Sequence, residues 1–304
     1  MINNTAAVKK GILFAVLACF IWSGNFIVAR AVIKEIPPVS LGFFRWATAS
    51  VLLAPFAWKK LVADRSIAWR HRAYFFWTAL FGITFFNTFI YLAGHYTSAL
   101  NLALIGTTSS PIIALVLARI FLGEKIPWQR AVGSLICVAG ILVLLSKGHW
   151  ETLLSLRFNR GDSIVLLGAL SFAIYNVLVR RKPAGMHPQS FLLLVFSLGA
   201  LMLLPGWLYE KGHHPPIQWT PAMLGVIAYL GIGTSIVSYL LWNAAIATLG
   251  AARTALFGNL IPLFASFEAA LLLHEKITWL HIVCSIVIVA GLVIINSRKP
   301  SSNS

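Results

Sequence analysis

The side chains that could do chemistry in this sequence are polar and aromatic residues inside long apolar runs. Asn25 lies close to Trp22, and Asn176 directly follows Tyr175. A carboxamide that is kept from water needs hydrogen-bond partners, and an aromatic ring offers a face for stacking. These two groups therefore suit the wall of a site for a small molecule. Hydrogen bonding between packed helices is the alternative explanation.

Two further apolar runs carry polar and aromatic residues at helical spacing. In a helix, residues at steps of three, one and three share one face, and one run has the set Thr84, Asn87, Thr88 and Tyr91. The other run has the set Ser235, Ser238, Tyr239 and Trp242. Hydroxyls bonded to their own helix backbone, together with aromatic packing, are the alternative. We predict that a small-molecule substrate is bound by Trp22, Asn25, Asn87, Tyr91, Tyr175, Asn176, Ser238, Tyr239 and Trp242.

Sequence patterns for catalysis or metal binding do not occur. The sequence has no His-Glu-x-x-His segment and no Gly-x-Ser-x-Gly segment. Its aspartates, Asp64 and Asp162, are expected in loops, and the pair His213-His214 is expected in a solvated loop. We therefore expect no enzyme activity, no metal and no cofactor.

Arg45 and Glu268 are among the charged residues that lie within apolar runs. They could pair with each other, because a charge in hydrocarbon is costly unless it is paired or hydrated. Alternatively, they could meet the two charges of a zwitterionic substrate. Glu124 and Glu275 close their runs at short turns, and we interpret both as structural.

The elements that position these residues are predicted to lie in a membrane. The chain has 304 residues, of which 59% are hydrophobic and 11% are charged, whereas about 25% of a soluble domain is charged. The net charge of +16 comes from Lys and Arg clusters between the apolar runs. This arrangement favours anionic lipid headgroups over nucleic acid as a partner. Three cysteines inside the runs are expected to pack rather than to form disulfides, namely Cys19, Cys137 and Cys284.

Ten apolar runs are long enough to cross a bilayer, which takes about 20 residues per helix. They are Gly11–Ile33, Ser40–Trp58, Ala73–Gly94, Ala99–Leu122, Trp128–Leu145, Ser163–Val179, Phe191–Leu208, Ala222–Ala244, Ala252–Leu273 and Leu280–Ile295. The linkers are too short to hold a separate soluble domain. Lys and Arg are concentrated in one alternate set of linkers, which predicts that both termini are cytoplasmic.

The sequence also repeats itself at one fixed offset without a gap. This offset aligns Asn25 with Asn176 and Pro111 with Pro262. Each repeat has five runs, an odd number, so the second repeat must enter the membrane from the opposite side. Inverted repeats of this kind are typical of transporters. We predict an all-α polytopic membrane protein with ten transmembrane helices, built from a first five-helix repeat at 1–146, a connecting loop at 147–160 and a second five-helix repeat at 161–304.

Several motifs resemble those of the EamA family, within the drug/metabolite transporter superfamily. The resemblance covers nearly the whole chain and rests on Trp22-Ser23-Gly24-Asn25, Leu41-Gly42-Phe43-Phe44-Arg45, the run from Pro111 to Glu124-Lys125 and the run from Pro262 to Glu275-Lys276. It implies a ten-helix carrier that exports amino acids and other metabolites. Within the family, the chain is most similar to the aromatic amino acid exporters of the YddG type. The resemblance also favours a structural role for Arg45. The second repeat departs from the pattern at His274, where glycine is usual, and at Phe196, which matches Arg45.

Together, these features predict a multi-pass transporter of the inner (plasma) membrane that exports small metabolites. Amino acids are the expected substrates, with aromatic ones favoured, and alternating access is the expected mechanism. The sequence is compatible with a monomer. The alternative is a passive channel or facilitator for small amphipathic solutes, which would show neither saturation nor exchange.

Overall fold

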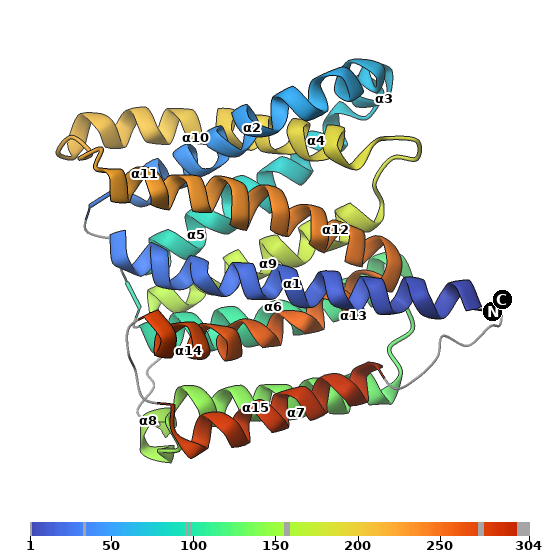
Figure 1. Ribbon diagram of the computed structural model, residues 1–304, viewed down its shortest axis with the longest axis vertical. Helices are drawn as coiled ribbons and strands as arrows, with labels where there is room; N and C mark the ends of the chain where they lie inside the picture. The colour runs from blue at the N-terminus through green and yellow to red at the C-terminus, as the bar shows by residue number, and fades with distance from the viewer. Residues whose placement is uncertain are drawn as a thin grey trace.

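The described chain is a bundle of helices that lie side by side (Figure 1). The computed structural model describes residues 2–32, 35–94, 96–97, 99–154, 159–272 and 277–296. No strand occurs within these residues. The all-α fold class predicted from the sequence is therefore confirmed for the part of the chain that the structure describes.

The helices of the first half are α1 (Ile2–Val32), α2 (Pro38–Ala63), α3 (Arg65–Arg70), α4 (Arg72–Ala79), the π-helix η1 (Leu80–Phe85), α5 (Phe86–Ala93), α6 (Ala99–Leu122), α7 (Trp128–Leu145) and α8 (Trp150–Leu154). Those of the second half are α9 (Arg160–Arg180), α10 (Pro188–His213), α11 (Pro221–Ala228), the π-helix η2 (Tyr229–Val237), α12 (Ser238–Leu249), α13 (Ala251–Ala255), the 3₁₀-helix η3 (Leu256–Leu260), α14 (Ile261–Leu272) and α15 (Trp279–Asn296). Each apolar run predicted from the sequence overlaps one of these helices or a consecutive group of them.

Eight helical stretches in the described residues are long and apolar enough to cross a membrane. They are Ala6–Asn25, Pro38–Ala63, Arg72–Ala93, Trp128–Leu145, Arg160–Arg180, Pro188–His213, Pro221–Leu249 and Trp279–Asn296. A shorter apolar stretch, Thr108–Leu122, lies within α6. Large apolar side chains also cover the outside of the bundle, and Phe56 and Leu135 are 73% and 67% exposed. Such a surface suits lipid rather than water.

Two antiparallel helix pairs form opposite edges of the bundle in Figure 1. Helix α2 packs against α10, and α7 packs against α15. The second pair approaches closely through glycine: a Cβ atom at Gly291 would lie 2.7 Å from the carbonyl oxygen of Gly133. Small residues that let backbones touch are typical of helix packing in membranes. Helices α1, α5, α6, α9, α12 and α14 lie between these pairs.

All three cysteines are buried and free, so the packing role expected for them is confirmed. The thiol of Cys19 donates to the carbonyl oxygen of Phe257 at 3.2 Å, and that of Cys137 donates to the carbonyl oxygen of Ile288 at 3.4 Å. Each bond joins an element of the first half to one of the second half.

The expected loop position of Asp162 is wrong. Asp162 lies in the first turn of α9 and is fully buried, where it forms a capping box with Asn159. A carboxylate in this position accepts a backbone N–H that would otherwise lack a partner, so the helix begins earlier than its apolar run. Asp64, by contrast, lies at the turn that ends α2, as expected.

Candidate binding cavity

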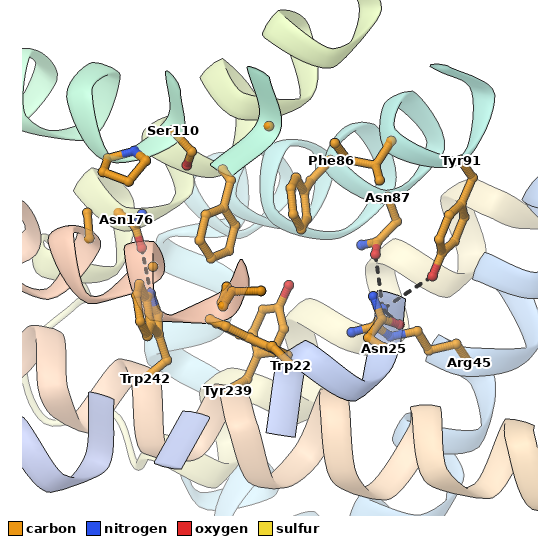
Figure 2. Close-up of a pocket in the computed structure, with 17 residues that line it drawn as sticks. Trp22, Asn25, Arg45, Phe86, Asn87, Tyr91, Ser110, Asn176, Tyr239 and Trp242 are labelled. Atoms are coloured by element: carbon orange, nitrogen blue, oxygen red, sulfur yellow. Dashed lines mark hydrogen bonds between the residues drawn. The ribbon is translucent and has the colours of Figure 1, made fainter. Parts of the chain in front are cut away.

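A partly enclosed cavity lies between the two edge pairs of the bundle (Figure 2). Its walls come from α1, α2, α5, α6, α9, α12 and the α13–α14 segment. The lining residues are Trp22, Asn25, Arg45, Phe86, Asn87, Ile90, Tyr91, Gly106, Ser110, Pro111, Phe172, Asn176, Tyr239, Trp242, Ala255, Gly258 and Ile261. Elements far apart in the sequence therefore build one site.

Most of the residues predicted to bind substrate line this cavity. The structure brings together Trp22, Asn25, Asn87, Tyr91, Asn176, Tyr239 and Trp242. Figure 2 shows Asn176 and Trp242 at one end, Trp22 and Tyr239 in the middle, and Asn25, Asn87 and Tyr91 around Arg45 at the opposite end. The remaining two predicted residues, Tyr175 and Ser238, are not among the lining residues.

Tyr175 is fully buried, and its hydroxyl donates to Oδ1 of Asn243 at 3.0 Å. Its ring occupies the space beside Gly82, where an added Cβ atom would lie only 2.1 Å away from it. The hydroxyl of Ser238 donates to the carbonyl oxygen of Gly233 at 2.9 Å, a bond to the preceding turn of its own helical segment. Ser238 therefore bonds to the backbone of its own helical segment, which was the alternative considered for these hydroxyls.

The third predicted run is also less uniform than a regular helix face. Asn87 and Tyr91 face the cavity, but the hydroxyl of Thr84 lies 3.5 Å from the carbonyl oxygen of Gly199 in α10. Thr84 belongs to the π-helix η1, whereas Asn87 follows in α5. A π-helical stretch changes the angular step per residue, so the spacing rule for an α-helix does not hold across it.

The aromatic rings of the cavity gather around Trp22, in its middle. Its ring centroid lies 4.9 Å from that of Trp242, 5.5 Å from that of Tyr239 and 5.7 Å from that of Phe172. Tilted and edge-on contacts at these distances are favourable for aromatic rings. The indole N–H of Trp242 donates to Oδ1 of Asn176 at 2.8 Å. The buried amide nitrogen of Asn176 has no partner among the described residues, so it is a donor available to a bound molecule.

At the polar end of the cavity, two nitrogens of the Arg45 guanidinium are bonded to the π-helix η2, away from the cavity. Its Nε donates to the hydroxyl of Ser235 at 2.8 Å, and its Nη2 donates to the carbonyl oxygen of Thr234 at 3.1 Å. The guanidinium carbon lies 4.7 Å from the centre of the Trp46 ring. Both Ser235 and Thr234 belong to η2, and π-helical turns are frequent at functional sites.

The other edge of Arg45 meets three side chains that line the cavity. Nη1 of Arg45 lies 3.2 Å from Oδ1 of Asn87, 3.3 Å from the hydroxyl of Tyr91 and 3.4 Å from Oδ1 of Asn25. These three acceptors are neutral, and they share a nitrogen that carries two hydrogens. The motif favoured a structural role for Arg45, and a contact with substrate was the alternative; Arg45 lies in the cavity wall, a position that is compatible with that alternative.

Arg45 and Glu268 do not pair. Neither residue takes part in the ion pair found among the described residues, which joins His187 and Asp64 at the edge of the bundle. Glu268 is not a lining residue; its Oε1 accepts a hydrogen bond from the hydroxyl of Ser23 at 2.7 Å. The pairing considered from the sequence is therefore absent in this conformation.

A carboxylate after α6 joins the first half of the chain to the second half. Glu124, after α6, accepts hydrogen bonds from the backbone N–H groups of Ala251 at 3.0 Å and Ala252 at 3.3 Å. Gly250 precedes them with φ of 89°, and a Cβ atom there would lie 2.9 Å from Oε1 of Glu124. The carboxylate therefore caps α13 at a turn that only glycine fits. Its predicted counterpart, Glu275, lies outside the described residues.

Comparison with known proteins identifies the family. The model of the EamA-like transporter family matches residues 9–146 and again residues 159–297. The chain belongs to the EamA-like transporter family. This EamA protein is thus a membrane transporter by family, in agreement with the resemblance found in its motifs.

Individual relatives agree with this assignment. An uncharacterized transporter of Archaeoglobus fulgidus is 29% identical over 96% of this chain and 99% of its own length. The uncharacterized transporter YyaM of Bacillus subtilis is 32% identical over 60% of both chains. A probable terminal-alkyne amino-acid exporter of Streptantibioticus cattleyicolor is 25% identical over 62% of this chain and 61% of its own. A crystal structure that is 15% identical has a TM-score of 0.74 and covers 94% of this chain and 96% of its own, which shows a shared fold.

Proposed function

We propose that this EamA protein exports small metabolites across the plasma membrane, with aromatic amino acids as favoured substrates. The observation that carries the proposal is a cavity with aromatic walls and a polar end, set inside a membrane bundle of a transporter family. Trp22, Phe172 and Trp242 offer ring faces and edges to an aromatic side chain. The name of the Streptantibioticus relative supports amino acids as the substrate class.

We further propose that ten spans form two inverted repeats, 1–146 and 161–304, joined by 147–160. The two separate matches to one family model support this arrangement. So does the position of the π-helices, because η1 and η2 interrupt the third run of each half. The first helix of each half also packs on equivalent helices of the other half. Helix α1 contacts α12 and α14, and its counterpart α9 contacts α5 and α6.

Alternating access is the mechanism that this arrangement favours. Two similar halves can exchange the roles of inner and outer gate around a site between them. If both termini lie in the cytoplasm, the contact of Glu124 with α13 lies toward the cytoplasmic end of the bundle and would serve as the gate there. Breaking it while a matching contact forms at the other end would turn the site to the cytoplasm for loading, and the reverse change would release a bound molecule outward.

A counterflow experiment tests the proposal. Purified protein in liposomes is preloaded with unlabelled phenylalanine, and uptake of labelled phenylalanine, tyrosine and tryptophan is followed. A carrier takes up label transiently above the equilibrium level and saturates with concentration. A passive channel shows neither effect. Absence of uptake for all aromatic amino acids, with a correctly inserted protein, would refute the substrate assignment.

A further inference from the structure

Arg45 is a buried positive charge without a negative partner. Its side chain lies within the span Pro38–Ala63, and the residue is 3% exposed. Every hydrogen-bond acceptor described around its guanidinium is neutral, and no carboxylate pairs with it among the described residues. A cation in this setting carries a large desolvation penalty that neutral dipoles offset only in part. An anion that reached the guanidinium would therefore be bound strongly.

The geometry leaves one edge of Arg45 for such an anion. Nε and Nη2 are directed to η2, and the flat face is covered by Trp46. Nη1 is directed to the cavity, where its three contacts are between 3.2 and 3.4 Å long. Hydrogen bonds between a guanidinium and a carboxylate are shorter and about twice as strong as neutral ones. A carboxylate in the cavity can thus replace these long contacts with better ones.

The cavity offers no comparable partner to a positive charge. Among the described lining residues, Arg45 is the one charged side chain. Glu268, the acid within the span of α14, accepts a hydrogen bond from Ser23 and does not line the cavity. The aromatic rings of Trp22, in the middle of the cavity, and of Trp242, at the end opposite Arg45, lie next to each other. The site therefore matches a molecule that has an anionic group at one end and an aromatic or apolar body at the other.

We propose that Arg45 binds the carboxylate of the substrate, and that this cavity recognises aromatic carboxylates as a class, without requiring an ammonium group. The proposal rests on the proposed export function and sharpens it. It predicts that an aromatic acid lacking the amino group is a ligand, whereas the corresponding amine is not. It also assigns a direct binding role to a residue that the family pattern suggested was structural.

Four matched ligands test this inference on the wild-type protein. Phenylalanine, 3-phenylpropanoate, 2-phenylethylamine and phenylalanine amide share one ring but differ in their charged groups. Binding is measured by ligand-induced thermal stabilisation in detergent, and transport by counterflow in liposomes. The first two ligands are expected to bind at least tenfold more tightly than the last two. Equal binding of the amine, or failure of 3-phenylpropanoate to bind, would overturn the inference.

The two readouts separate this inference from the proposed function. If the two carboxylates bind selectively but nothing is transported, export is wrong and the role of Arg45 stands. If all four ligands are transported equally well, export stands and the role of Arg45 is wrong. Binding of none of the four would refute the inference as well, because it predicts affinity for the carboxylates.

Variants of Arg45 provide a second test. Arg45→Gln removes the charge but keeps hydrogen-bond donors, and it is expected to abolish the tenfold preference for carboxylates. Arg45→Lys restores the charge and is expected to keep part of the preference. Arg119→Gln, at an exposed arginine of α6, is the matched control and should behave like the wild type. If Arg45→Gln folds and still prefers carboxylates, Arg45 is structural and the inference fails.

Discussion

Asn25 and Asn176 occupy equivalent positions in the two halves of this protein, but their side chains make different hydrogen bonds. Oδ1 of Asn25 lies near the guanidinium of Arg45, at 3.4 Å, whereas Oδ1 of its counterpart Asn176 accepts from the indole of Trp242 at 2.8 Å. The two amides thus mark a charged end and an aromatic end of one cavity. A duplicated scaffold with diverged side chains can in this way bind a molecule whose two ends differ.

Tyr91 gives a direct test of the cavity wall. Its ring lines the cavity and its hydroxyl contacts Arg45. Tyr91→Ala removes both and is expected to lower the rate of counterflow at least tenfold, with near-normal expression. Tyr96→Ala is the control, because Tyr96 is 59% exposed and lies outside the lining. Wild-type transport by Tyr91→Ala would mean that this surface only packs.

The sequence allowed part of the site to be predicted at the level of residues. Asn87 and Asn176 stood out because an amide in an apolar run needs a partner. Phe86 and Phe172 were missed, because a cavity-facing phenylalanine has the same composition signal as a lipid-facing one such as Phe20. Tyr175 was assigned to the site by adjacency, although neighbouring helix residues point in different directions.

At the scale of elements, helices α2 and α10 are joined at both ends by a carboxylate that accepts backbone hydrogen bonds. Glu210 of α10 accepts hydrogen bonds from the backbone N–H groups of Val39 at 3.1 Å and Ser40 at 2.7 Å, at the start of α2. Asp64, at the end of α2, accepts from the backbone N–H of His187, before α10, at 3.0 Å. Each helix thus receives a capping carboxylate from the other.

The Asp64 contact predicts a pH dependence of stability. Burial alone would raise the pKa of Asp64, but the hydroxyl of Ser190 and the backbone and ring of His187 outweigh this effect and lower the pKa. A lowered folded-state pKa means that the stabilisation is complete above the ordinary pKa of an aspartate and is lost as the pH falls through the lowered value. Asp64→Asn should therefore lower the unfolding temperature at neutral pH.

The difference between Asp64→Asn and the wild type should shrink in acid, below the ordinary range of aspartate titration. Thermal unfolding in detergent from pH 7 downward measures it. Asp64 follows the span that ends at Ala63, so the group titrates outside the membrane. A difference that stays constant at every pH would contradict the proposed charge dependence.

The close approach of α7 and α15 makes a second prediction for an element pair. Gly291→Val would place side-chain atoms against the backbone of Gly133 and the thiol of Cys137, both 2.7 Å from an added Cβ atom. Overpacking of this kind costs about 1–3 kcal/mol. The unfolding temperature should fall clearly, whereas Val289→Leu, at an exposed position on the same helix, should leave it nearly unchanged.

Helices were predictable from the sequence, but irregular turns were not. Long apolar runs required helices, and the bounds of α6 and α7 agree with those of their runs. The π-helices η1 and η2 lie inside long, mostly apolar runs that read as uninterrupted helices. One extra residue per turn leaves no trace in such a composition, so the faces predicted across them were only partly right.

At the scale of the whole molecule, the orientation of the protein in the membrane can be tested. The first described residues of α1 and the last of α15 lie at the same end of the bundle (Figure 1). The distribution of Lys and Arg places that end in the cytoplasm. A reporter fused after Ser304 should therefore be active only in its cytoplasmic form. A periplasmic signal would overturn the proposed orientation.

Movement of the two halves should depend on the contact between Glu124 and α13. Glu124→Gln keeps the size of the side chain but removes the negative charge that the start of α13 favours, so the cytoplasmic end should open more often. Glu151→Gln, an exposed acid in α8, is the control. The three native cysteines are buried, so a single introduced thiol can report on access to the cavity.

Ser110→Cys provides this thiol in the cavity wall. A membrane-impermeant thiol reagent is applied to vesicles from the cytoplasmic side, and the rate of labelling is measured with Glu124 intact and with Glu124→Gln. We expect faster labelling in the variant and slower labelling from the opposite side, because a rocking bundle opens one end as it closes the other. Unchanged rates on both sides would mean that Glu124 only ends its helix. Faster labelling on both sides would indicate a pore rather than a carrier.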